Sequence, residues 1–306
     1  MANGKEIMRD YQHVREHYVN FLTRWELQAP FIDPSRLGIL ATIVPGQNQM
    51  KEVYDSTTLG ANDLLSKFIS SSTFSPGQRW GRMIAKKYAV GDRDEIDDWC
   101  DEVTNKMLKA FGASNFYAEA PDMTKDYTGF GTGSLHFDER KEYASDYERR
   151  RRGFRGLRFQ ATKTGRFFNA VSAEGKIDKE YRECEMSARA ARDKFGEDNL
   201  PENIKKHLES DNNKEKFFTF LHAAYPRPRS EYKGRGSLSY PWASCWVEKE
   251  SKEIVRESGY KFYPFANPRW EVTPGEIPGR GPGDRAFPDT RSLNEAKKLD
   301  LEALAI

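Results

Sequence analysis

Apolar side chains near the start of the chain recur at intervals of three and four residues. They lie between residues 5 and 27, at Ile7, Tyr11, Val14, Tyr18, Phe21 and Trp25. This spacing places one apolar face on an amphipathic helix. Pro30 predicts the end of that helix, because a proline has no N–H to donate to the preceding turn.

Three more helices are predicted before residue 130. The first begins after Asp55 and Ser56, which are favourable N-cap residues. We expect it to turn its apolar side chains inward, and these are Leu64, Leu65, Phe68 and Ile69. The second begins within a run at 92–102 that holds seven acidic residues, and its apolar residues are Ile96, Trp99, Val103, Met107 and Phe111. Acidic side chains in a first turn suit the helix dipole. The third spans 114–127.

The chain changes character after residue 156. Segments 157–162 and 166–171 flank a Lys-Thr-Gly turn at 163–165, which predicts a β-hairpin. Apolar spacing over 178–195 predicts a helix that places Cys184 in its packing face. A short helix after Pro201 follows.

The rest of the chain adds strands and a last helix. Strands are predicted at 217–225, 242–248, 254–258 and 260–265, and a helix at 292–306. Helices followed by a mixture of strands and helices indicate an α+β fold.

Composition narrows the class of protein. The 306 residues are 31% charged and 13% aromatic, with a formal net charge of +2. This balance excludes a uniformly basic nucleic-acid coat and an acidic tail protein. No stretch approaches the roughly 18 apolar residues of a membrane span. We expect a folded protein with an aromatic-rich core, made in a reducing compartment, because its three cysteines form no paired motif.

The motifs give no reason to propose catalysis, a cofactor or a metal. The glycines at 129–134 lack the strand-loop-helix order of a phosphate-binding loop, and a turn with positive φ explains them better. His13 and His17 are four residues apart on one helix, but no third ligand stands nearby. We therefore expect a protein that is not an enzyme.

The strongest electrostatic feature is a basic segment at 140–166. It holds ten Lys and Arg residues against three acidic ones. Its candidate interface or DNA-facing residues are Arg149, Arg150, Arg151, Arg152, Arg155 and Arg158. They could bind nucleic-acid phosphates, with strong salt dependence. We favour pairing with carboxylates of a neighbouring subunit, such as the 92–102 run, because guanidinium groups bind carboxylates in a bidentate manner.

Several short motifs occur in a fixed order along the chain. They are VYDST at 53–57, SPGQRW at 75–80, SNFY at 114–117, GFGTG at 129–133, AAYPR at 223–227, PRW at 268–270 and GRGPG at 279–283. The series resembles the portal proteins of short-tailed bacteriophages, also called head-to-tail connecting proteins. One departure is Gly81, where that family usually carries a bulky aromatic residue.

The resemblance implies a structural subunit of a ring at one capsid vertex, with a DNA channel at its centre. A full-length protein of this family usually forms a dodecamer. The implied partners are terminase, scaffold and capsid protein, tail or adaptor proteins, and double-stranded DNA, with no membrane. The implied location is the virion, after assembly in the cytoplasm of the host bacterium.

The resemblance also implies a division of the chain. Residues 1–288 correspond to the helix-rich, strand-containing wing of the portal fold, and 289–306 to the start of the stem helix. By the family's order, the clip, the second stem helix and the crown are absent. We therefore expect this chain alone to form few or no closed rings.

Overall fold

The computed structural model describes residues 3–40, 50–85, 93–139, 156–209, 214–232 and 236–304. The α-helices in these ranges are α1 (Gly4–Glu16), α2 (Val19–Ile32), α3 (Thr57–Thr73), α4 (Arg93–Gly112), α5 (Phe116–Phe130), α7 (Ala188–Phe195), α8 (Glu202–Glu209) and α9 (Pro282–Leu304). The strands are β1 (Ser134–Glu139), β2 (Leu157–Thr162), β3 (Phe167–Val171), β4 (Ile177–Ser187), β5 (Phe217–Pro226), β6 (Trp242–Glu248), β7 (Ile254–Tyr260) and β8 (Phe265–Ala266). This mixture confirms the predicted α+β class.

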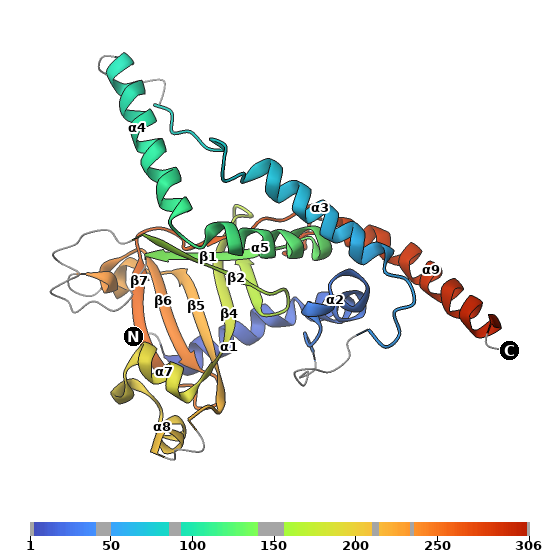
Figure 1. Cartoon of the computed structure of the whole chain (residues 1–306). Helices are drawn as coiled ribbons and strands as arrows, with labels where there is room; N and C mark the ends of the chain where they lie inside the picture. The colour runs from blue at the N-terminus through green and yellow to red at the C-terminus, as the bar shows by residue number, and fades with distance from the viewer. Residues whose placement is uncertain are drawn as a thin grey trace.

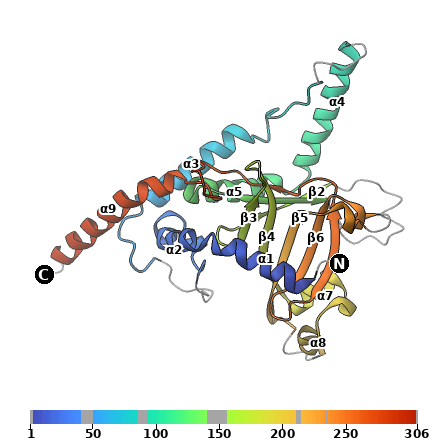
Figure 2. The same cartoon turned by 180° about the vertical axis from the view of Figure 1, so that it is seen from behind.

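The strands form two antiparallel sheets. One has five strands in the order β3-β4-β5-β6-β7, and the other has three in the order β2-β1-β8. Helix α1 lies across one face of the five-stranded sheet (Figure 2). Helices α7 and α8 pack on its other face, near one end of the strands (Figure 1). The five-stranded sheet is therefore covered on both faces, which gives the molecule its main core.

The N-terminal apolar face packs against this sheet as predicted. All six side chains of the pattern are buried, and Trp25 is 1% exposed. The segment forms two helices rather than one, because the chain bends at Tyr18. The Tyr18 hydroxyl accepts from the Asn169 N–H at 2.9 Å, which ties the bend to β3. Pro30 does not end the second helix, which continues to Ile32; Asp33 then caps the 3-10 turn η1 (Pro34–Arg36).

The predicted helix over 178–195 is wrong in its first part. Residues up to Ser187 form strand β4, and only α7 is helical. Tyr181 faces the core under α1 and Arg182 faces the opposite side, and both are buried. A strand buried on both faces shows little alternation, so tertiary pairing with β3 and β5 overrides a helical spacing of apolar residues. Cys184 consequently lies on a strand, half-buried.

The predicted hairpin is also wrong. The turn forms, with Gly165 at φ 84°, but β2 pairs with β1 while β3 pairs with β4. The chain crosses from one sheet to the other at this turn. The Thr164 N–H donates to Asp126 on α5 at 3.1 Å, so the turn is held by a helix rather than by a partner strand.

Most of the remaining predictions agree with the structure. The strands expected at 217–225, 242–248 and 254–258 are β5, β6 and β7, and the helix after Pro201 is α8. The strand expected at 260–265 is limited to β8, which pairs with β1. The last helix begins at Pro282, ten residues before the expected position, because Pro282 and Pro288 are both accommodated within it.

Candidate functional site

Two glycine motifs meet where α5 ends and α9 begins. Gly131 has φ 81°, the left-handed conformation that commonly ends a helix at glycine. A Cβ added at Gly131 would lie closer than 3.0 Å to the backbone of Gly279 and Gly281. Gly283 approaches the backbone of Gly129 in the same way. These contacts fix the direction in which α9 leaves the body, and they explain glycines that resembled a phosphate-binding loop.

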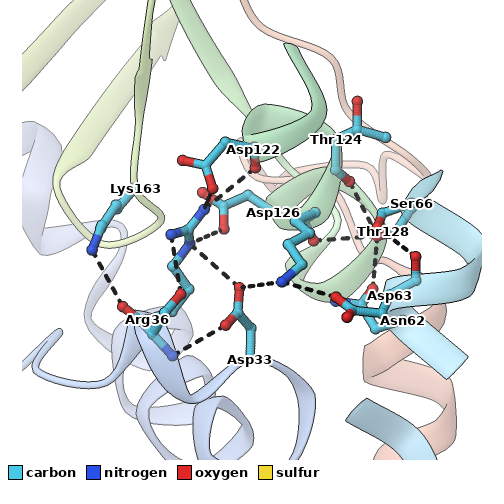
Figure 3. A network of polar contacts seen from close by, with 12 residues as sticks. Asp33, Arg36, Asn62, Asp63, Ser66, Asp122, Thr124, Asp126, Thr128 and Lys163 are labelled. Atoms are coloured by element: carbon cyan, nitrogen blue, oxygen red, sulfur yellow. Dashed lines mark hydrogen bonds and ion pairs between the residues drawn. The ribbon is translucent and has the colours of Figure 1, made fainter. Parts of the chain in front are cut away.

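A charged network joins η1 to α5 and α3 (Figure 3). The Arg36 side chain is buried; its Nε donates to Asp126 Oδ1 at 2.6 Å, and its Nη2 donates to Asp122 Oδ1 at 2.8 Å. Lys125, the residue before Asp126 on α5, pairs with Asp63 of α3 at 2.8 Å. The network therefore links three segments that are distant in sequence.

The network stays charged at neutral pH. Burial raises the pKa of Asp126 to about 6, although the charge of Arg36 opposes this shift. Burial alone disfavours the Arg36 cation, but the charges of Asp126 and Asp122 raise its pKa above the ordinary value. A buried cation held by carboxylates of another helix positions that helix firmly.

Helix α3 turns a polar face toward the body. Asn62 and Ser66 are its buried residues, and Asn62 Oδ1 accepts from the Thr128 hydroxyl at 2.7 Å. Leu64 is 73% exposed and Phe68 is 66% exposed. The prediction that Leu64 and Phe68 point inward is therefore wrong, because hydrogen bonds to α5 occupy the inner face. Leu65 and Ile69 are half-buried.

Two other helices also present apolar side chains to solvent. Helix α4 projects from the body (Figure 1), with Trp99 58% exposed and Met107 45% exposed. The end of α9 projects on the opposite side (Figure 1), with Leu301 and Leu304 exposed. We call the exposed large apolar residues of α3, α4 and α9 the assembly surface; its members are Leu64, Phe68, Trp99, Met107, Leu293, Leu299, Leu301 and Leu304. These residues lie on three different helices, two of which project on opposite sides of the body (Figure 1).

The basic segment is not tested by the structure. Arg149, Arg150, Arg151, Arg152 and Arg155 lie outside the described residues. Arg158 lies on β2, exposed, opposite Asp138 in the β1–β2 register. Within the described ranges, no group of three or more His, Cys, Asp or Glu residues could hold a metal ion. The helices described are also all too short or too polar to cross a bilayer.

A buried carboxyl group lies between the two sheets. Glu180 of β4 is 0% exposed. The Ser134 hydroxyl donates to its Oε1 at 2.7 Å, and the Asn267 amide donates to its Oε2 at 2.6 Å. Burial outweighs these bonds and raises the pKa of Glu180 to about 7. The folded protein thus holds a proton here that the unfolded chain releases at lower pH.

Glu180→Gln is expected to change how stability depends on pH. Between pH 4.5 and about 7 the folded wild type binds more protons at Glu180 than the unfolded chain, so its stability falls as pH rises through this window. In the wild type the free energy of unfolding falls by about 3 kcal/mol over this pH range, and Glu180→Gln is expected to lack this fall. Urea unfolding at a series of pH values measures the difference. Glu185→Gln, on the exposed end of the same strand, is the control, and equal pH profiles in wild type and Glu180→Gln contradict the prediction.

The family model described as "Bacteriophage head to tail connecting protein" matches residues 4–306. The chain belongs to this family. Among curated relatives of this head-to-tail connecting protein, the "Portal protein" of Salmonella phage epsilon15 is 23% identical over 301 residues, covering 97% of this chain and 51% of the relative. The "Probable portal protein" of Bordetella phage BPP-1 is 24% identical over 261 residues, covering 85% of this chain and 45% of the relative. The chain spans about half the length of these relatives.

Proposed function

We propose that this chain is a structural subunit of a phage portal, the ring at the capsid vertex through which DNA is packaged and ejected. Membership of the head-to-tail connecting family over nearly the whole chain carries this proposal. The family has a structural role, and we extend this to propose that the subunit catalyses no reaction. The terminase, scaffold and capsid proteins, tail or adaptor proteins and double-stranded DNA are its proposed partners, in the virion and, before that, in the host cytoplasm.

The fold supports a division of the subunit into a body and a projecting helix. The two sheets with α1, α2, α5, α7 and α8 form a compact body, which we propose is the wing. Helix α9 leaves that body at the glycine contact and extends away from it (Figure 2), as a helix entering the stem does. The assembly surface then contacts neighbouring copies of the chain, in a ring that we propose has twelve subunits in the full-length protein.

Leu64→Ser/Phe68→Ser is expected to weaken self-association by at least about tenfold. Burying a Leu or Phe side chain contributes about 1.5–3 kcal/mol, and 1.4 kcal/mol corresponds to a factor of ten. Sedimentation velocity and native mass spectrometry over a concentration series measure the association. The fold is not expected to change, because both side chains are already exposed.

The matched control is Phe262→Ser/Val272→Ser, which removes two exposed apolar side chains (77% and 47%) outside the assembly surface. It is expected to associate like the wild type. Open oligomers count as association in this experiment. A wild type that remains monomeric at all concentrations, or a control that weakens as much as the test variant, contradicts the assigned surface.

A further inference from the structure

Four strands of the larger sheet place a row of polar and aromatic residues side by side. Arg182, His222, Trp246 and Arg256 are direct register partners on β4, β5, β6 and β7. Residues directly opposite one another in antiparallel strands project from the same face. The smaller sheet packs on this face near one end of the strands, and α7 packs on it near the other (Figure 1). The row lies between them.

Arg182 is a buried cation in this row. Its side chain is 2% exposed. Its Nε donates to His222 Nδ1 at 2.9 Å and its Nη1 donates to Gln160 Oε1 at 3.2 Å. Because His222 Nδ1 accepts a hydrogen bond, it carries no proton, and the imidazole is neutral. The carboxyl group on the same strand face, Glu180, bonds Ser134 and Asn267 instead.

The charges of three arginines, Arg182 among them, act on Lys194. Lys194 of α7 places its Nζ 3.5 Å from the centre of the Trp246 ring. Desolvation there, together with the charges of Arg182, Arg158 and Arg256, lowers the pKa of Lys194 to about 8. We call this group the cationic site; its members are Arg158, Arg182, Lys194 and Arg256.

In the described part of the chain, the cationic site holds more cations than acidic groups. Among the described residues, no carboxylate lies within 4.0 Å of any of its four members. Asp138 is the acidic neighbour on β1, opposite Arg158. Glu180, on the same strand face as Arg182, interacts with the Arg182 charge. With both acidic residues included, four cations face two carboxyl groups. An excess of like charges in one part of a fold causes repulsion, and a multiply charged anion relieves this repulsion.

We propose that the cationic site binds a phosphate group, of a free polyphosphate or of a nucleic-acid backbone. Guanidinium groups present paired N–H donors that match two phosphate oxygens, and an ammonium adds a point charge. Arg158, Lys194 and Arg256 are exposed and can reach a ligand in solvent. All four cations belong to one chain, so phosphate binding at this site does not require the proposed portal ring.

The test variant is Arg158→Gln/Lys194→Gln/Arg256→Gln, which leaves the buried Arg182 in place so that the fold is retained. The control is Lys176→Gln/Lys206→Gln/Arg229→Gln, which removes three exposed cations from other elements. Calorimetry with sodium pyrophosphate at constant ionic strength measures binding of a free polyphosphate by the full chain. Fluorescence anisotropy of a short labelled DNA duplex, at several salt concentrations, measures binding of a backbone.

Saturable binding of either probe is expected, weakened at least about tenfold in the test variant and little changed in the control. Pyrophosphate binding identifies a free phosphate as the ligand. Binding of DNA alone, with a steep salt dependence, identifies the backbone.

Three outcomes overturn the proposal. In the first, neither probe binds saturably. In the second, the control loses as much affinity as the test variant, which leaves only a dependence on net charge. In the third, no phosphate binds but the test variant loses self-association, which assigns the site to carboxylates of a second copy. Because the cations of the test variant are not part of the assembly surface, phosphate binding succeeds or fails independently of Leu64→Ser/Phe68→Ser.

Discussion

Gly131→Ala is expected to lower the free energy of unfolding by about 2–5 kcal/mol. A residue with a side chain in the left-handed conformation costs about 1–2 kcal/mol, and Gly131 has φ 81°. The added methyl group also meets the backbone of Gly279 and Gly281, which cannot rotate away as a side chain could. Forcing extra volume into a packed contact costs about a further 1–3 kcal/mol. Urea unfolding followed by circular dichroism measures the total.

The matched control separates these two contributions. Gly275 has φ 85°, but an added Cβ there meets nothing within 4 Å. Gly275→Ala is therefore expected to show only the backbone cost. The excess in Gly131→Ala is assigned to the contact between the end of α5 and the start of α9. If both variants lose the same stability, the close approach of the two motifs contributes nothing to the fold.

The glycine motifs show what the sequence could and could not predict. The glycines at 129–134 predicted a turn with positive φ, and Gly131 has that conformation, whereas the glycines of 279–283 do not. Nothing in the sequence states that residues 129–133 and 279–283 touch, because a contact between two backbones leaves no pattern in either segment. The one hint of this contact was that the sequence holds two glycine-rich motifs, because backbone without side chains allows two segments to approach closely.

Hydrophobic pattern predicted burial well where a helix packs on a sheet and poorly where it packs through polar groups. The face at Ile7, Tyr11 and Val14 is buried because it meets an apolar sheet. Leu64 and Phe68 follow the same spacing and remain exposed, because Asn62 and Ser66 supply the inner face of α3. Pattern alone therefore cannot distinguish a core from a surface meant for another chain.

The cationic site could not be predicted from the sequence. Its residues lie on two sheets and a helix, and only strand register brings Arg182, Trp246 and Arg256 into one row. The spacing of apolar residues over 178–195 predicted a helix, which would have placed Arg182 on a solvent face. The segment around Arg182 shows little alternation, because the strand is buried on both faces, so it could not be interpreted without the partner strands.

Arg36→Gln is expected to lower the free energy of unfolding by about 3–5 kcal/mol. The guanidinium stands between Asp126 and Asp122 and is almost fully buried. Its removal leaves the buried Asp126 without a counter-charge, and an unpaired buried charge costs more than the pair contributes. The loss is expected to be smaller at acidic pH, because burial raises the pKa of Asp126 to about 6 and protonation below that value neutralises the group.

Two further variants decide whether burial of the charge is the cause. Arg36→Gln/Asp126→Asn removes both charges and is expected to recover part of the lost stability, because no unpaired charge remains. Arg79→Gln breaks the ion pair between Arg79 and Asp101, whose side chains are 40% and 39% exposed. It is expected to lower the free energy of unfolding by less than about 1 kcal/mol. If Arg36→Gln costs no more than Arg79→Gln, the network does not hold η1 to α5.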